Sequence, residues 1–343
     1  MKYIFFTLIS FLTLNTFAQQ NVEVAAIGFY NLENLFDTIE DPDINDEDFL
    51  PDGNYKYNTY VYNDKLKNLS QVISEMATEI TPDGVVLLGV SEIENKSVLI
   101  DLVKHSNIAK RNYQIVHYDS PDERGIDVAL LYNPKYFTVL ESKNLYVQLP
   151  DRDGEVNYTR DVLWVKGTLL GEEMHVFVNH WPSRRGGEAK SSPLRELAAA
   201  VAKKKIDEIL AKNKNAKIVL MGDLNDDPVN NSVKKVIGAK GNIAQVKKGE
   251  MYNPWMSMYK NGTGTLAYRD AWNLFDQIII SSGISDEKTN GFRFYKAKIF
   301  SKPYMFNTDG KYKGYPKRAY SWGKYVGGYS DHLPTYIYLV REK

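Results

Sequence analysis

Cysteine is absent from the 343 residues of this chain. Disulfide bonds and thiolate chemistry are therefore excluded. An excess of charge is also absent, because 43 Lys and Arg residues balance 43 Asp and Glu residues. Net charge gives no reason to expect or to exclude an anionic partner, so only local clusters of charge can inform on partners.

The chain also lacks a long apolar run and a flexible linker. The apolar stretch at residues 4–14 is too short for a comfortable membrane span. It follows the basic start Met1-Lys2 and precedes Thr16-Phe17-Ala18, a pattern typical of signal peptidase substrates. We predict a signal peptide at residues 1–18 and a secreted or periplasmic protein with no integral membrane span. No segment rich in Gly, Ser or Pro divides the remainder, so residues 19–343 are predicted to form one domain, which we expect to be a monomer.

The apolar residues 218–221 predict a β-strand that is buried on both faces. The strand is followed by Gly222, Asp223 and Asn225, then by further acidic residues and Pro228. Carboxylates this close repel one another unless a cation or protons lie between them. Asp and Asn oxygens suit a hard cation such as magnesium or calcium. An Asx-rich turn, which is common after a strand, is the alternative.

Polar residues follow or precede other apolar runs in the same way. Each one alone is explained as a turn residue, a surface charge or a packed histidine, but together they predict a site along one edge of the sheets. Oxygen ligands for one octahedral cation come from five positions: Asn31, Glu92, Asp223, Asn225 and Asp331. His180 and His332, two of only five histidines, suit proton transfer, and Arg184 suits a phosphate. Such a set fits hydrolysis of a phosphoester.

Helical spacing of apolar residues occurs at 65–80 and 194–210, and shorter helices are expected at 97–104 and 229–237. Apolar β-rich runs predict many strands, which include residues 22–30, 85–90, 128–132, 174–178, 278–280 and 335–340. Many strands with few helices between them favour packed sheets flanked by helices.

Six motifs in a fixed order resemble the endonuclease/exonuclease/phosphatase superfamily. They are Asn-Leu-Glu-Asn at 31–34, Ser-Glu-Ile-Glu at 91–94, Arg-Gly-Ile-Asp-Val-Ala at 124–129, Asn-His-Trp-Pro-Ser at 179–183, Gly-Asp-Leu-Asn at 222–225 and Ser-Asp-His at 330–332. The resemblance implies an α/β fold, namely a four-layer α/β sandwich of two packed mixed β-sheets flanked by helices, with the site at one edge.

The resemblance also implies roles for these residues. Glu92 would be the principal metal ligand, with Asn31 beside it. Asp223 and Asn225 would bind or position metal, nucleophile and phosphate, and Asp331 would bind metal or position phosphate. The expected cofactor is Mg²⁺, with Mn²⁺ or Ca²⁺ as alternatives.

Proton transfer is assigned by the same resemblance. His332 would act as general base on water or as a phosphate-binding cation, and Asp276 would orient it. His180 would protonate the leaving oxygen, with Asp127 to orient it. Arg124 would contact the phosphate.

Two segments have an unusual composition, and the first bears on the substrate. Residues 292–325 hold nine basic residues, one acidic residue and many aromatics. This composition suits nucleic acid or a lipid surface, or it reflects tyrosines packed under a loop with solvated lysines. We predict a nuclease, with a phosphodiesterase or phosphatase of lipid head groups or small phosphoesters as the alternative.

The second segment, residues 37–52, holds eight acidic residues and no basic one. It imitates the start of a calcium loop but lacks the required glycine. We therefore expect an exposed loop and keep a calcium-dependent structural module as a hypothesis from another class. A binding protein that has lost catalysis is a further hypothesis. Every motif position needed for catalysis is filled, which argues against it.

Overall fold

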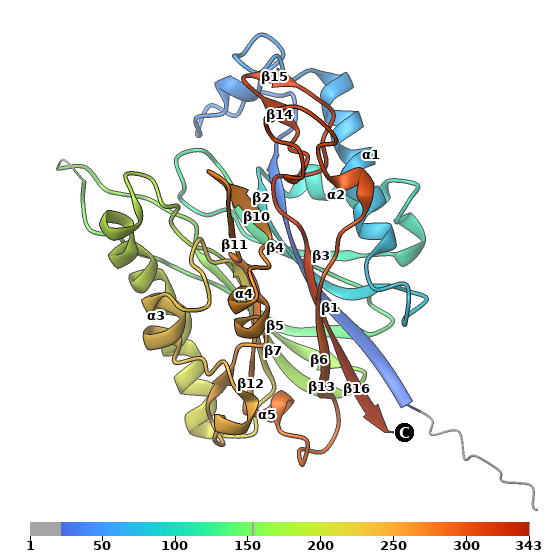
Figure 1. The fold of residues 1–343 in the computed structure, drawn as a ribbon, viewed down its shortest axis with the longest axis vertical. Helices are drawn as coiled ribbons and strands as arrows, with labels where there is room; N and C mark the ends of the chain where they lie inside the picture. The colour runs from blue at the N-terminus through green and yellow to red at the C-terminus, as the bar shows by residue number, and fades with distance from the viewer. Residues whose placement is uncertain (1–21, 153, 343) are drawn as a thin grey trace, which may run out of the picture.

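The computed structural model describes residues 22–152 and 154–342, so the predicted signal peptide lies outside the described residues. A first six-stranded sheet forms around β1 (Val22–Leu35), which pairs in parallel with β2 (Val85–Ile93) and antiparallel with β16 (Thr335–Glu342). Figure 1 shows the long β1 running up the molecule beside the C-terminal strand. The strands of this sheet lie in the order β13 (Arg293–Ile299), β16 (Thr335–Glu342), β1 (Val22–Leu35), β2 (Val85–Ile93), β4 (Asp127–Tyr132) and β3 (Gln114–His117).

A second six-stranded sheet is also mixed, because β7 (Glu172–His180) and β8 (Ile218–Asp223) pair in parallel while its other neighbouring strands pair antiparallel. Its strands lie in the order β5 (Phe137–Leu145), β6 (Val162–Leu169), β7 (Glu172–His180), β8 (Ile218–Asp223), β12 (Asp276–Ser281) and β9 (Met251–Tyr252).

The two sheets pack face to face, and the alternation of side chains along β8 shows how. Val219 and Met221 enter the core between the sheets, where they join Phe29 of β1. Ile218 and Leu220 point to the opposite face and pack under α3 (Glu188–Lys212). A strand covered on both faces needs apolar residues at every position, which explains the continuous run at residues 218–221.

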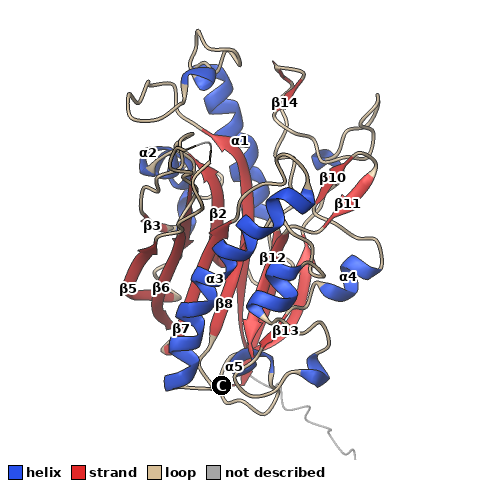
Figure 2. Ribbon diagram, turned by 90° about the vertical axis from the view of Figure 1, so that its left-hand side faces the viewer, coloured by secondary structure: helices blue, strands red, loops and turns tan. Residues whose placement is uncertain are grey.

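Helices complete the four layers. The helices α1 (Thr59–Glu75) and α2 (Lys96–Lys104) pack on the outer face of the first sheet. Figure 2 shows α3 lying across the outer face of β7 and β8. The predicted four-layer α/β sandwich is confirmed. Two short helices, α4 (Met256–Lys260) and α5 (Ser282–Ser285), follow β9 and β12, and within the described residues no helix is long and apolar enough to cross a bilayer.

Several boundaries differ from the predicted ones. The first helix spans Thr59–Glu75, not residues 65–80, because the Asn58 side chain accepts the Val61 N–H and caps an earlier start. β1 continues through Asn31 to Leu35, so Asn31 lies inside the strand. Two small hairpins were not predicted, one formed by β10 (Leu266–Tyr268) with β11 (Ala271–Asn273) and one by β14 (Tyr320–Ser321) with β15 (Lys324–Tyr325).

The segment at residues 292–325 is largely accounted for by packing. Tyr304, Tyr320 and Tyr325 lie against the core under α1. The guanidinium of Arg318 pairs with two carboxylates, and Lys298 pairs with Glu79. This outcome matches the interpretation in which the tyrosines pack under a long loop.

Candidate active site

The topology brings the predicted residues to one edge of the sandwich. Parallel strands β7 and β8 end side by side, with His180 opposite Asp223 in the register. The antiparallel strand β12 begins at the same edge, with Asp276 opposite Asp223. In the first sheet, Asn31 lies opposite Ser91, which precedes Glu92 at the end of β2. Side chains from both sheets therefore meet where the strands end.

Glu92 and Asp223 form the acidic centre of this edge. The Asn31 amide nitrogen donates to Glu92 Oε1 at 3.2 Å and to Asp223 Oδ2 at 3.0 Å. Glu92 adopts a left-handed backbone conformation with φ of 57°, which is strained for a side-chain-bearing residue and persists where the surroundings enforce it. Its other oxygen accepts the Asn34 N–H at 3.1 Å. Burial raises the pKa of Asp223 to about 7, and the charges of Asp276 and Glu92 add to this effect.

The Asn31 side chain bridges the two central carboxylates. Its side-chain oxygen accepts the Glu33 N–H at 2.8 Å, and its nitrogen faces the two carboxylates. Asn31 therefore holds Glu92 and Asp223 at a fixed separation, and its role as a metal ligand stays a prediction.

His180 lies beside the same two carboxylates. Its Nε2 is 3.7 Å from Glu92 Oε1 and 3.6 Å from Asp223 Oδ2, and its Nδ1 has no partner among the described residues. Burial, followed by the charges of Arg160 and Arg124, lowers the pKa of His180 well below its usual value. Burial therefore favours the neutral imidazole, and the role of His180 as a proton donor stays a prediction.

His332 is held in the opposite charge state. Its Nδ1 lies 2.7 Å from Asp276 Oδ2, and its Nε2 lies 3.8 Å from Asp223 Oδ2. Burial alone would lower the pKa of His332, but the charges of Asp276 and Asp223 outweigh it and raise the pKa. The predicted contact between Asp276 and His332 is thus present, with Nε2 left to face Asp223.

Asn225 lies at the site, whereas Arg184 lies behind it. The Asn225 N–H donates to Asp223 Oδ1 at 2.9 Å, and its side-chain amide donates to the Trp181 carbonyl at 3.0 Å. The Arg184 guanidinium donates to the Asn225 carbonyl and to the side chains of Asp226, Asp227 and Asn230. These contacts of Nε and Nη2 hold the loop after β8, and phosphate binding by Arg184 stays a prediction.

Two further predicted site residues have their hydrogen bonds outside the centre. Asp127 accepts from His117 Nε2 at 2.9 Å and from Ser120, so it orients His117 and not His180. Asp331 accepts from Arg318 at 2.9 Å and is not part of the carboxylate–imidazole clusters found in the described chain, but it is near enough for its charge to raise the pKa of His332. Its role at the metal or phosphate stays a prediction. Arg124 is half-exposed, lies 3.4 Å from Asp122, and is near enough for its charge to act on His180.

The donor set at the centre fits a hard divalent cation. One atom each from Glu92, His180 and Asp223 lies within 4.8 Å of the others. Across residues 22–152 and 154–342, the ion pairs of Glu92 and Asp223 involve only histidines. Two carboxylates close together without a permanent cation repel each other, and a bound metal ion would balance them.

Two supporting groups were not found from the sequence. Arg160 is buried and donates to the carbonyls of His180 and Trp181 at 3.2 and 2.7 Å and to Asp122 at 3.0 Å. Lys65 is also buried, and its ammonium donates to the Glu33 carbonyl at 2.6 Å. Arginine and lysine are common in any sequence, so no motif or spacing distinguished these two.

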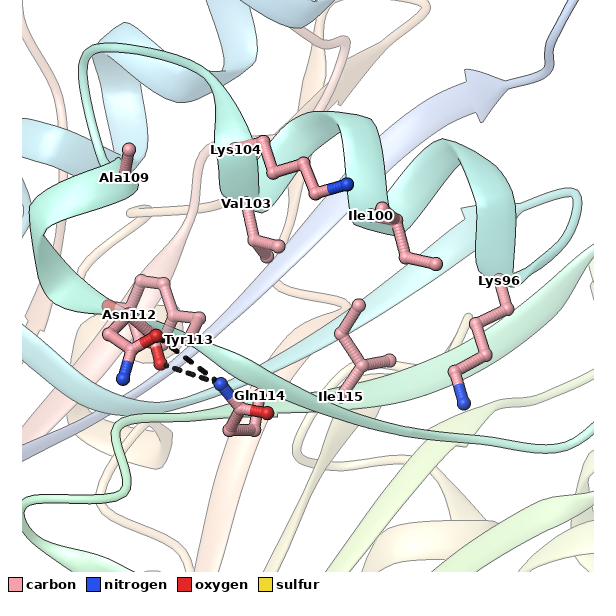
Figure 3. Close-up of a pocket in the computed structure, with 9 residues that line it drawn as sticks. All are labelled: Lys96, Ile100, Val103, Lys104, Ala109, Asn112, Tyr113, Gln114 and Ile115. Carbon is pink, nitrogen blue, oxygen red and sulfur yellow. Dashed lines mark hydrogen bonds between the residues drawn. The ribbon is translucent and has the colours of Figure 1, made fainter.

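A separate hollow of about 410 Å³ lies between α2 and β3. Figure 3 shows Lys96, Lys104 and Ile115 along it, while Gln114 is turned toward Asn112. Its lining contains no carboxylate and none of the predicted site residues. The chemistry of the edge therefore does not extend into this hollow.

The family model of the endonuclease/exonuclease/phosphatase family matches residues 26–341. The chain belongs to this family. Its match covers both sheets and every motif described above, so the resemblance seen in the sequence is confirmed. The members of the family hydrolyse phosphoester bonds. No curated protein matches the chain.

Solved structures share the fold at low sequence identity. A family protein from Bacteroides thetaiotaomicron has a TM-score of 0.57 and 16% identity, covering 94% of this chain and 97% of its own. A mannosyl-6-phosphatase from Bacteroides thetaiotaomicron has a TM-score of 0.55 and 17% identity, covering 92% and 99%. D. rerio TDP2 complexed with a single-strand DNA product has a TM-score of 0.53 and 14% identity, covering 92% and 98%.

Proposed function

We propose that the protein is an exported, divalent-metal-dependent phosphodiesterase that hydrolyses nucleic acid. The observation that carries this proposal is the meeting of Glu92, His180 and Asp223 with the Asp276–His332 pair at one edge. This arrangement combines a cation site with two imidazoles in opposite charge states. Hydrolysis of a phosphodiester by water needs both charge stabilisation and proton transfer.

Glu92 and Asp223 would hold the metal ion, with His180 and Asn225 beside them. When bound, the ion supplies positive charge against the phosphoryl oxygens. Asn31 keeps the two carboxylates in place through its amide nitrogen. The loop after β8 is kept in place by Arg184.

His332 would accept the proton of the attacking water at Nε2. Its Nδ1 donates to Asp276, which sets the tautomer and stabilises the imidazolium that forms. Because the pKa of His332 is raised, only the fraction that is neutral before the reaction can act as a base. If His332 is the base, activity should increase as pH rises above 7. If His332 instead binds phosphate as a cation, activity should fall over the same range, because the ring loses its charge.

His180 would act as a neutral hydrogen-bond donor. Its pKa is lowered by burial, so an Nε2–H can donate to a phosphoryl or leaving oxygen without transferring its proton. The unpartnered Nδ1 is consistent with a neutral ring.

Support for nucleic acid comes from the segment around β14 and β15. Lys311, Lys313 and Lys324 are exposed, and Trp322 is 81% exposed at the turn between the two strands. Exposed lysines can follow a phosphate backbone, and an exposed indole can stack on a base. D. rerio TDP2, which shares the fold, is complexed with a DNA product.

A small phosphoester is the second candidate substrate. The acidic loop at residues 37–52 contacts the loop that carries Arg124 through the Asn45 N–H and the Glu123 carbonyl, and its charges would repel a long polyanion. A mannosyl-6-phosphatase also shares the fold. Export is proposed from residues 1–18 of the sequence alone.

A substrate panel tests the proposal. Purified protein is assayed with and without Mg²⁺ on single-stranded DNA, RNA, sphingomyelin, mannose 6-phosphate and an aryl phosphodiester. We expect metal-dependent release of nucleotides, and a loss of about 10²–10⁴-fold in kcat for His332→Gln. Asp223→Asn should abolish the metal-dependent activity. The variant should keep its fold, which circular dichroism checks.

His105→Gln serves as the control, because His105 lies at the end of α2 away from the strand ends. Near-normal turnover in Asp223→Asn or His332→Gln would refute the site. Hydrolysis of mannose 6-phosphate without hydrolysis of DNA or RNA would favour the second candidate.

A further inference from the structure

The Arg318 side chain lies at the edge of the sandwich that carries the candidate active site. Its Nη2 donates to Asp331 Oδ2 at 2.9 Å, and its Nε lies 3.6 Å from Glu33 Oε1. Asp331 directly precedes His332, and Glu33 follows Asn31 by two residues. Two segments that each supply a residue to the site therefore hold this guanidinium between them.

The chain on both sides of the β14–β15 hairpin is tied to β1 at the same edge. The Ala319 N–H donates to Glu33 Oε2 at 2.8 Å, and the Ser330 hydroxyl donates to the Asn31 carbonyl at 2.8 Å. The Asn31 side chain in turn donates to Glu92. A continuous series of contacts therefore joins the hairpin to the central carboxylates.

The helix α1 also holds the hairpin. The Tyr325 hydroxyl donates to Asp64 Oδ2 at 2.7 Å, and the Asn68 amide donates to the Gly328 carbonyl at 3.1 Å. Asp64 and Asn68 are four residues apart and so lie on one face of the helix. Figure 1 shows β14 and β15 at the top of the molecule, next to α1. The hairpin is therefore anchored by both β1 and α1.

Arg318 has donors left over after its two carboxylate contacts. Its side chain is 53% exposed, whereas that of Glu33 is 7% exposed. Within residues 22–152 and 154–342, its Nη1 has no hydrogen-bond partner. A guanidinium carries five N–H donors in a rigid fork, which is more than these two contacts use. A structural ion pair alone does not explain the exposed donors, because exposed pairs contribute little to stability.

The surroundings of Arg318 are basic and aromatic. Lys317 precedes it and Lys324 lies in β15, and neither lysine forms an ion pair in the described parts of the chain. Trp322, at the turn between β14 and β15, is 81% exposed. Residues 311–324 hold five basic residues and no acidic one. This combination fits a polyanion whose bases can stack.

We propose that Arg318 binds the backbone phosphate next to the scissile one, on a single strand of nucleic acid that crosses the β14–β15 hairpin. This inference rests on the proposed hydrolysis of nucleic acid and adds a residue that sets its substrate preference. Among the described residues, the ion pairs of Arg318 lie outside the groups that could hold the metal ion, so it reaches a neighbouring phosphate and not the scissile one. A small phosphoester with one phosphate would gain nothing from this contact.

Kinetics on two substrates test the proposal. Arg318→Met is assayed on single-stranded oligothymidylate, which has many phosphates, and on the aryl phosphodiester, which has one. We expect KM for oligothymidylate to rise about tenfold, as for the loss of one charged hydrogen bond. The value of kcat/KM for the aryl phosphodiester should stay unchanged.

Binding gives a readout that needs no turnover. Fluorescently labelled oligothymidylate is titrated with His332→Gln protein in Mg²⁺, with and without Arg318→Met, and fluorescence anisotropy gives Kd. Kd should rise about tenfold with Arg318→Met. The slope of log Kd against log salt concentration should fall by about 0.7, which corresponds to the loss of one phosphate contact on a single strand.

Arg293→Met is the matched control. Arg293 also pairs with a carboxylate, that of Glu342 at 3.2 Å, but it lies opposite Val340, near the end of β16 that is far from the site. This variant should change neither KM nor Kd. Arg318→Gln covers the case in which Arg318→Met fails to fold, because it keeps a hydrogen-bonding side chain at this position.

Equal losses on both substrates would overturn the proposal, because Arg318 would then act through Asp331 and His332. Unchanged KM and Kd in both Arg318 variants would overturn it as well. If oligothymidylate binds through Arg318 but no substrate is hydrolysed, the proposed function fails and the contact stands. A wild-type protein that does not bind oligothymidylate overturns both.

Discussion

The Arg160 side chain holds the strand end that carries His180. Its guanidinium donates to the carbonyls of two successive residues, His180 and Trp181, and pairs with Asp122. The side chains of Arg160 and Asp122 are 5% and 7% exposed, so the pair is nearly removed from water. A buried guanidinium with three acceptors fixes the backbone on both sides of the imidazole.

Arg160→Met should destabilise the protein and displace His180. The variant leaves Asp122 without its buried partner, which we expect to cost about 3 kcal/mol, at the low end for a broken buried pair because Arg124 also reaches Asp122. Urea unfolding measures the loss of unfolding free energy, and a lower kcat reports the displacement of His180. Arg185→Met, which removes an exposed guanidinium, should change neither. Equal stability of the two variants would contradict this account of Arg160.

At the scale of elements, the turn after α1 is tied to the first sheet through Glu79. The Lys298 ammonium of β13 and the Tyr336 hydroxyl of β16 both donate to Glu79 Oε1. Burial alone would raise the pKa of Glu79, but these hydrogen bonds outweigh it and lower the pKa to about 2. The folded state therefore binds the Glu79 proton less tightly than the unfolded state does.

This difference predicts a pH dependence of stability. The contribution of Glu79 is fully present above its unfolded pKa of 4.5 and is lost as pH falls toward 2. Between these values, the wild-type protein should lose more stability than Glu79→Gln, in which the group cannot titrate. The loss is expected to be small, because Glu79 is partly exposed and screened by solvent. If the unfolding free energy of the two proteins changes with pH at the same slope, Glu79 does not contribute to the pH dependence.

At the scale of the whole molecule, the separation of the two sheets sets the width of the site. Gly89 of β2 faces Met221 of β8 across the core, and a Cβ at Gly89 would lie 2.5 Å from the Met221 sulfur and 3.2 Å from the Phe29 ring. Glu92 and Asp223 are three and two residues further along these same strands. Close approach of β2 and β8 therefore brings the two carboxylates together.

Gly89→Val should push the sheets apart below the site. Overpacking of this kind costs about 1–3 kcal/mol, and the increased separation of Glu92 from Asp223 should also reduce metal-dependent activity. Gly89→Ala is the milder control, because the flexible Met221 side chain can shift to admit one methyl group. Urea unfolding and turnover are measured on both variants. Wild-type stability and turnover in Gly89→Val would rule out this role for the sheet separation.

Local sequence determined much of the fold and the centre of the site. Continuous apolar runs identified the buried strands, and 3.6-residue spacing identified α1 and α3, because periodicity reflects which faces a segment must bury. Glu92, Asp223 and His332 were found because polar residues recur at the ends of such strands, although each one alone has a structural explanation. The joint order of the motifs then indicated the family.

Only the tertiary structure decided which partner each charged residue takes. Asp127 was expected beside His180 but bonds His117, and Arg184, which was expected at the phosphate, holds the loop after β8. Arg160 was not found at all, since its three acceptors lie 20, 21 and 38 residues away along the chain. The sequence restricts the residue types and the faces they occupy. Pairing between charges depends on distances across the packed sheets, and the charge state of each histidine depends on burial, neither of which is encoded by any short stretch of the chain.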